Sequence, residues 1–155
     1  MTDIEIRLAN EEDYPVIEKI MQQVQQLHIS LRPDIYKPVS TALTKEELMQ
    51  GIGQKSFYVA EAEGKPVGVL SFLHRSVRGA HQVPREVLFV DTMAVDEAYR
   101  GKGVGKAFLE FLKEEKTERG FDGIELQVNA RNIAAYDIYR HWGFTEKSIN
   151  MELPE

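Results

Sequence analysis

Hydrophobic residues in the first third of the chain are spaced as in one strand followed by one helix. Apolar and polar residues alternate over residues 4–9, as in a half-buried strand. Asn10 is a favourable N-cap, and apolar residues then recur at helical spacing over residues 16–27. Residues 29–43 contain two prolines and no regular period, which predicts an irregular connection.

The middle of the chain has the pattern of a short helix followed by several strands. Thr44, with Glu47 three residues later, predicts a capping box at the start of the helix. Two apolar strands within residues 56–75 flank a Glu-Gly-Lys turn, which is a hairpin signal. Residues 76–86 predict a polar loop. Residues 87–95 are apolar almost throughout, which predicts a central strand.

Helical and extended patterns alternate in the last third of the chain. Apolar residues at helical spacing predict a helix over residues 104–119, with Gly120 directly after its end. Residues 121–128 predict another strand, and residues 132–142 predict another helix. Residues 144–153 are predicted to be extended again.

This order of elements predicts a mixed α/β fold. The strands first meander and are then joined through helices. That arrangement favours a mixed, mostly antiparallel sheet with helices on both faces over a doubly wound sheet. Because no internal repeat or linker divides the sequence, we expect one domain over residues 1–155.

The composition is typical of a soluble globular protein and narrows the function only slightly. The chain has 155 residues, of which 43% are apolar and 28% charged, and its formal net charge is −6. That charge disfavours nucleic acid as a partner and suits a cationic substrate such as an amine. The sequence has no cysteine, no apolar run that could span a bilayer and no signal-peptide pattern, so we expect a cytoplasmic protein without membrane contact. Its four histidines share no metal-ligand spacing, so we expect no metal.

The stretch "RGKGVGKA" between the central strand and the following helix is a candidate phosphate-binding loop. At such a turn, the free N–H groups and the dipole of the helix both face an anion. A P-loop requires four residues between its glycines, whereas Gly101 and Gly105 are separated by three. A dinucleotide fingerprint starting at Gly101 or Gly103 would require glycine at Lys106 or Phe108. Both familiar phosphate motifs are therefore excluded.

A different motif does match this loop. Arg100-x-x-Gly103-x-Gly105 resembles the acetyl-CoA-binding signature of the GNAT superfamily of N-acetyltransferases. The later superfamily segment N-x-x-A-x-x-x-Y-x-x-x-G-F is matched by Asn132, Ala135, Tyr139, Gly143 and Phe144. The opening "IRLANEEDYPVI" is also similar to the first strand and helix of that family, so the resemblance covers nearly the whole chain. It implies the GNAT fold and transfer of acetyl from acetyl-CoA to a primary amine by direct attack in a ternary complex.

The resemblance also implies where acetyl-CoA binds. Backbone amides of the glycine loop would hold the pyrophosphate, and the end of the central strand would pair with the pantetheine arm like an added strand. Asn132 would contact the cofactor, although it is equally suited to cap its own helix, and the loop lysines fit a solvated role as well. The implied cofactor contacts are Met93, Ala94, Val95, Arg100, Gly101, Lys102, Gly103, Val104, Gly105, Lys106, Asn132, Ala135 and Tyr139.

Three residues are candidates for the chemistry. The resemblance makes Tyr139 the general acid that protonates the departing thiolate, with packing against the sheet as the alternative role. Asp91 is the first candidate for the base, because an unpaired carboxylate in an apolar strand is costly to bury. Substrate binding or a local hydrogen bond are the other roles that suit Asp91. Glu86, at the start of the same strand, is the second candidate base.

The sequence leaves the acceptor open between a small-molecule amine and a peptide or protein amine. In the family, the connection that includes Tyr36, together with the neighbouring His28 and Asp91, would border the acceptor pocket. Eleven residues follow Phe144. Many relatives use a longer segment there, so we expect a more open pocket or one that the second subunit of a homodimer completes. The alternatives to an acetyltransferase are a non-catalytic acyl-CoA-binding module and a nucleotide-phosphate enzyme.

Overall fold

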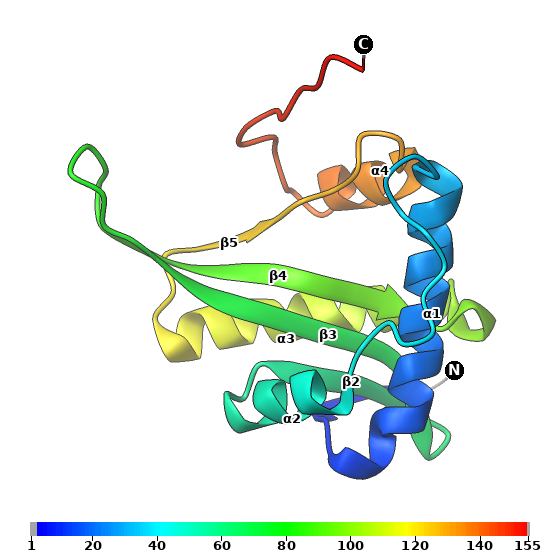
Figure 1. Ribbon diagram of the computed structural model, residues 1–155. Helices are drawn as coiled ribbons and strands as arrows, with labels where there is room; N and C mark the ends of the chain where they lie inside the picture. The colour runs from blue at the N-terminus through cyan, green and yellow to red at the C-terminus, as the bar shows by residue number, and fades with distance from the viewer. Residues whose placement is uncertain (1–2, 155) are drawn as a thin grey trace.

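The computed structural model describes residues 3–154 and has a five-stranded sheet with helices on both faces (Figure 1). The strand order is β1-β2-β3-β4-β5; the first four strands are antiparallel, and β5 is parallel to β4. This confirms the predicted mixed, mostly antiparallel sheet. The elements are β1 (Glu5–Leu8), η1 (Glu11–Asp13), α1 (Tyr14–Leu31), α2 (Lys45–Gly53), β2 (Phe57–Ala62), β3 (Lys65–Val77), β4 (Arg85–Val95), η2 (Glu97–Tyr99), α3 (Val104–Arg119), β5 (Gly123–Leu126) and α4 (Ile133–His141).

Two apolar layers hold the helices to the sheet. Because side chains of a strand alternate between its two faces, β2, β3 and β4 contribute to both layers. One layer joins α3 to the sheet and includes Leu70, Leu88, Val104, Phe108 and Leu112. The other joins α1 and α2 to the opposite face and includes Ile17, Ile20, Leu48, Val59 and Val69. Within residues 3–154, none of the helices has the length and apolar character needed to cross a membrane.

The predicted helix starts are present. The Asn10 side chain accepts a hydrogen bond from the Asp13 N–H at 3.2 Å, and the Asp13 carboxylate accepts one from the Asn10 N–H at 2.9 Å. Asp13 also receives two hydrogen bonds from Arg7, at 2.8 and 2.9 Å. Thr44 and Glu47 form the predicted capping box at α2. Asn10 therefore caps the short 3-10 helix η1, which leads directly into α1, and Thr44 caps α2.

The connection between α1 and α2 is irregular, as predicted, but side chains of α1 hold it through hydrogen bonds. The helix continues to Leu31, beyond the expected boundary. The Glu18 carboxylate accepts hydrogen bonds from the N–H groups of residues 42 and 43 at 3.0 and 2.8 Å. Gln22 and Gln25 donate to carbonyl groups at residues 39 and 37. One face of α1 thus fixes the path of the connection.

Two sequence predictions were wrong at the sheet boundaries. The polar loop expected over residues 76–86 is shorter, because the β3–β4 ladder continues to the pair Val77 and Arg85. Next to this hairpin extension, the Arg75 guanidinium lies 3.5 Å from the centre of the Phe89 ring. Residues 144–153, expected as a last strand, pair with no strand in the described part of the chain, so the element order ends at α4.

Candidate functional site

The strands β4 and β5 part halfway along β4 (Figure 1). Their parallel pairing ends at Val90 and Leu126, whereas the pairing of β4 with β3 continues to Val95 and Gly68. Residues 91–95 of β4 therefore have a partner strand on one side and, within residues 3–154, an open edge on the other.

The open edge carries backbone groups that are available to a ligand. Beyond the strand, the Asp96 N–H donates to the Val67 carbonyl at 2.9 Å, on the side of β3. Successive residues of a strand direct their N–H and C=O groups to alternate edges. Val95 and Met93 consequently direct theirs toward the open side, while Ala94 bonds toward β3 and packs its side chain against the layer of α1.

A β-bulge lies at the point where the strands part. Ser71 pairs with Thr92 and Phe72 pairs with Val90, which leaves Asp91 as the extra residue of β4. The Asp91 side chain is exposed, so the expected burial among apolar neighbours was wrong. A bulge turns a side chain away from the regular alternation and is frequent beside active sites. The carboxylate thus stands next to the open edge without the cost of burial.

The glycine loop follows β4 and ends at the N-terminus of α3. Gly101 and Gly103 have φ values of 75° and 90°, in the left-handed region that side chains disfavour. A methyl group added at either position would meet no atom within 4 Å. Free space therefore lies in front of the loop, and the first N–H groups of α3 have no partner within the helix. The Val104 side chain is buried in the core, while the exposed side chains of the loop are Arg100, Lys102 and Lys106.

Two other glycines allow neighbouring elements to pack closely. A methyl group at Gly105 would lie 3.3 Å from the Trp142 ring, so this glycine admits the end of α4 beside the start of α3. A methyl group at Gly68 of β3 would lie 2.9 Å from both Phe108 and Val104 of α3. Sequence reasoning missed Gly68, although an isolated glycine within a strand pattern is a signal of close approach.

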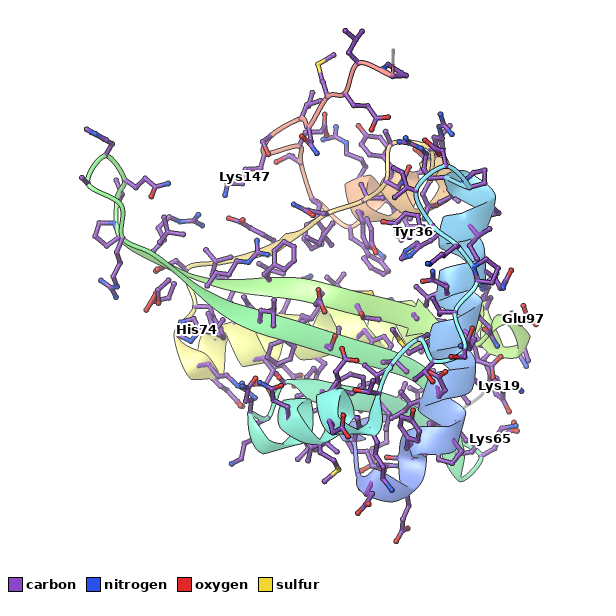
Figure 2. All side chains as sticks on the ribbon, viewed as in Figure 1. Lys19, Tyr36, Lys65, His74, Glu97 and Lys147 are labelled. Atoms are coloured by element: carbon purple, nitrogen blue, oxygen red, sulfur yellow. The ribbon has the colours of Figure 1, made fainter. Side chains whose placement is uncertain are left out.

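Two contacts that sequence reasoning also missed hold the segment between β4 and the loop. The Gln23 side chain of α1 accepts a hydrogen bond from the Glu97 N–H at 3.0 Å and donates to the Asp96 carboxylate at 3.3 Å. Figure 2 shows Glu97 beside α1. The buried Tyr99 donates its hydroxyl proton to Glu63 at 2.9 Å, and the Lys102 ammonium lies 5.0 Å from its ring centre. The loop therefore leaves the sheet at a fixed position.

The helix α4 carries Tyr139. Asn132 caps this helix by accepting a hydrogen bond from the Ala135 N–H at 3.2 Å. The half-buried Tyr139 ring lies between Trp142 and Phe144, with both ring centres 5.9 Å away. Burial raises the pKa of Tyr139, so its phenol keeps its proton at neutral pH. In the described residues, the Tyr139 hydroxyl has no hydrogen-bond partner.

Glu86 occupies the other end of β4. Asp91 is five positions further along the chain, which corresponds to roughly 17 Å along a strand. Its carboxylate accepts hydrogen bonds from Ser76 at 3.0 Å and Arg78 at 3.2 Å. The bond from Ser76, followed by that from Arg78, lowers the pKa of Glu86. These contacts tie Glu86 to the hairpin extension and not to the open edge.

His28 and Tyr36 are brought together at the end of α1. Their ring centres are 4.8 Å apart, and burial lowers the pKa of His28, which keeps the imidazole neutral at pH 7. Arg131, from the loop before α4, donates to the Leu31 carbonyl at 3.0 Å. Tyr36 is thus at the same end of α1 as α4 (Figure 2).

The sequence and the fold of this chain are similar to those of known proteins. The sequence model of the Acetyltransferase (GNAT) family matches residues 21–144. An uncharacterized N-acetyltransferase of Methanocaldococcus jannaschii is 32% identical over 96 residues, which is 62% of this chain and 42% of that protein. The ribosomal protein bS18 alanine N-acetyltransferase of Escherichia coli is 42% identical over 57 residues, 37% of this chain and 38% of the enzyme. The chain thus spans about two fifths of the length of these curated relatives.

The fold has a close counterpart among solved structures. The crystal structure of a mutant BH1408 protein from Bacillus halodurans superposes with a TM-score of 0.87. The alignment covers 97% of this chain and 99% of that protein, at 24% sequence identity. At this identity the similarity establishes the common fold alone.

Proposed function

Because the chain belongs to the GNAT acetyltransferase family, we propose that it transfers an acetyl group from acetyl-CoA to a primary amine. The observation that carries this proposal is the open edge of β4 at residues 91–95, which leads directly into the glycine loop. An extended pantetheine arm can add to such an edge through main-chain hydrogen bonds. The N–H groups at the start of α3 suit the pyrophosphate that follows the arm in CoA.

The proposed reaction is direct attack in a ternary complex. The amine nitrogen attacks the thioester carbonyl carbon, and Asp91 accepts the amine proton directly or through a water molecule. When the tetrahedral intermediate collapses, the C–S bond breaks and Tyr139 donates a proton to the departing sulfur. The products are the acetylated amine and free CoA. No acyl-enzyme is required, and the chain contains no cysteine that would form one.

The environments of the two residues support these roles. Burial raises the pKa of Tyr139, so the phenol holds the proton that the thiolate requires. Asp91 is exposed, at the bulge beside the open edge. A solvent-facing carboxylate can take a proton and release it to water between turnovers.

The acceptor would enter on the side of His28 and Tyr36, where the connection is fastened to α1. A peptide α-amine is the acceptor class to test first, because one relative is named for acetylating an alanine of a ribosomal protein. Small amines and aminoglycosides form the second acceptor class, and both classes are tested together in one panel of acceptors.

Release of CoA thiol from acetyl-CoA, measured with this panel of acceptors, tests the proposal. We expect turnover with at least one amine and a mass increase of one acetyl group on that acceptor. Binding of acetyl-CoA without turnover across the panel would instead favour a non-catalytic acyl-CoA-binding module. Displacement of acetyl-CoA by ATP would indicate a nucleotide-phosphate enzyme.

A further inference from the structure

The helix α1 passes the end of β4 and continues to α4. In Figure 1 it crosses the sheet beside the point where β4 ends, and its last turn lies next to α4. At that far end, the Arg131 side chain donates to the Leu31 carbonyl at 3.0 Å. Where α1 passes β4, Gln23 forms hydrogen bonds with the chain directly after the strand. The helix therefore lies along the opening between β4 and α4, with Gln23 at the end near the glycine loop.

Residues 96–99 join the two parts of the proposed CoA site. They follow the open edge of β4 at residues 91–95 and precede the glycine loop, and residues 97–99 form the short helix η2. A CoA molecule would contact the edge with its pantetheine arm and the loop with its pyrophosphate. The distance and direction between these two parts therefore depend on how residues 96–99 are held.

The Gln23 side chain holds this link from the opposite face of the sheet. The helix α3, which follows the loop, and α1 belong to different apolar layers. The Gln23 Oε1 atom accepts a hydrogen bond from the Glu97 N–H at 3.0 Å, and its Nε2 atom donates to the Asp96 carboxylate at 3.3 Å. The same Asp96 oxygen accepts a hydrogen bond from the Ala98 N–H at 3.1 Å. The amide, the carboxylate and the start of η2 thus form one network.

This network requires a side chain that both donates and accepts at the length of glutamine. Because a backbone N–H can only donate, the bond from Glu97 fixes the orientation of the Gln23 amide and leaves Nε2 for Asp96. A glutamate at position 23 would lack the donor and would place a second carboxylate next to Asp96. A methionine has a similar length and makes neither bond, so it removes the network without a large change in size.

Gln23 acts separately from the side chains of α1 that hold the connection to α2. Glu18, Gln22 and Gln25 make those hydrogen bonds, and their spacing of four and three residues places them on one face of the helix. Gln23 is turned by about 100° from Gln22, because an α-helix has about 3.6 residues per turn. Gln25 is therefore a matched control residue on another face of the same helix.

We propose that Gln23 is a positioning residue that holds the edge of β4 and the glycine loop in the relative position that a whole CoA molecule requires. This inference rests on the proposed function, because it takes CoA as the ligand of both parts. Two binding parts act together only when their geometry lets one ligand engage both at once. Without the amide, whole CoA would have to order residues 96–99 as it binds, whereas a fragment that touches one part alone would not.

Gln23→Met tests this proposal with CoA and its separate halves. We expect the affinity for CoA, measured by calorimetry, to fall roughly tenfold, which is the scale of one net hydrogen bond. The phospho-ADP half of CoA and pantetheine, each titrated by NMR, should bind as they do to the wild type. Gln25→Met removes a hydrogen bond of 2.8 Å on the other face of α1 and should leave all three affinities unchanged. Both glutamines are partly exposed, so circular dichroism should show both variants to be folded.

Three results would overturn the inference. An unchanged CoA affinity in Gln23→Met would show that the link keeps its position without the amide. An equal loss of affinity for CoA and for its phospho-ADP half would show that Gln23 only maintains the shape of the loop. An equal loss of CoA affinity in Gln25→Met would show that any weakening of α1 has the same effect. A wild-type chain that binds no CoA would instead contradict the proposed function itself, so the two failures are distinguishable.

Discussion

The helix α3 approaches β3 closely at Gly68, and Gly68→Ala tests whether this contact positions the glycine loop. The added methyl group would lie 2.9 Å from the Phe108 ring and from Val104, and 3.1 Å from the Ala94 carbonyl oxygen. Phe108 is fully buried and Val104 is 2% exposed, so neither side chain has free space to move into. The first turn of α3 must therefore shift away from the sheet.

Overpacking of this kind costs typically about 1–3 kcal/mol. For a chain of this length, a loss of about 2 kcal/mol lowers the melting temperature by roughly 4–8 °C. Because Val104 is the first residue of α3, the shift also displaces the N–H groups of the loop. We therefore expect weaker binding of CoA, measured by calorimetry at a temperature where the variant is fully folded, together with the lower melting temperature.

Gly53→Ala is the control for replacing glycine by alanine at a position where no clash results. Gly53 is in α2, and a methyl group there meets no atom within 4 Å. That substitution should leave CoA affinity unchanged and should not lower the melting temperature, because alanine is favoured over glycine in a helix. Val104→Ala in the background of Gly68→Ala should restore part of the lost affinity, because it removes one of the clashing groups. Unchanged CoA affinity in Gly68→Ala would refute the view that this contact sets the position of the loop.

Three further predictions concern the acid, the loop and the acid stability of the fold. Tyr139→Phe should lower kcat by about 10²- to 10⁴-fold with little change in the affinity for acetyl-CoA; an unchanged kcat would remove its role as the acid. Gly103→Glu should abolish CoA binding, since it places a carboxylate in the anion site; because a side chain at φ 90° also strains the backbone, binding is measured by calorimetry at a temperature where circular dichroism shows the variant to be folded. Retained binding would contradict the phosphate role. Burial opposes ionisation of Asp13, but the hydrogen bonds from Arg7 and the Asn10 N–H outweigh it and lower its pKa. The stabilisation from the Asp13–Arg7 ion pair is therefore fully present above the pKa of Asp13 in the unfolded chain, about 3.9. It is lost as the pH falls through the lower pKa that Asp13 has in the folded protein. Asp13→Asn should lower the urea midpoint at pH 7, and its difference from wild type should shrink below about pH 4.

Features that depend on neighbours in the sequence were predictable from it. The N-cap at Asn10 and the capping box at Thr44 satisfy N–H groups within three residues, so a short stretch of sequence is sufficient to predict them. Gly120 follows α3 with a φ of 74°, as expected of a residue that ends a helix. The loop with Gly101 and Gly103 was recognisable for the same reason, because its motif and the left-handed conformation of its glycines are local.

Features that depend on which strands meet could not be derived from the sequence. Asp91 is exposed because β4 contains one residue more than the paired part of β3, and the register between two strands has no signature within either. The open edge of β4 exists only because β5 stops pairing at Leu126. Glycine is required at position 105 because the Trp142 ring, which comes from a segment far along the chain, packs against it. The sequence by itself therefore determined the family, most of the elements and the glycine loop. The tertiary structure decided where the edge of β4 opens and which side chains face it, because those properties arise from contacts between distant segments.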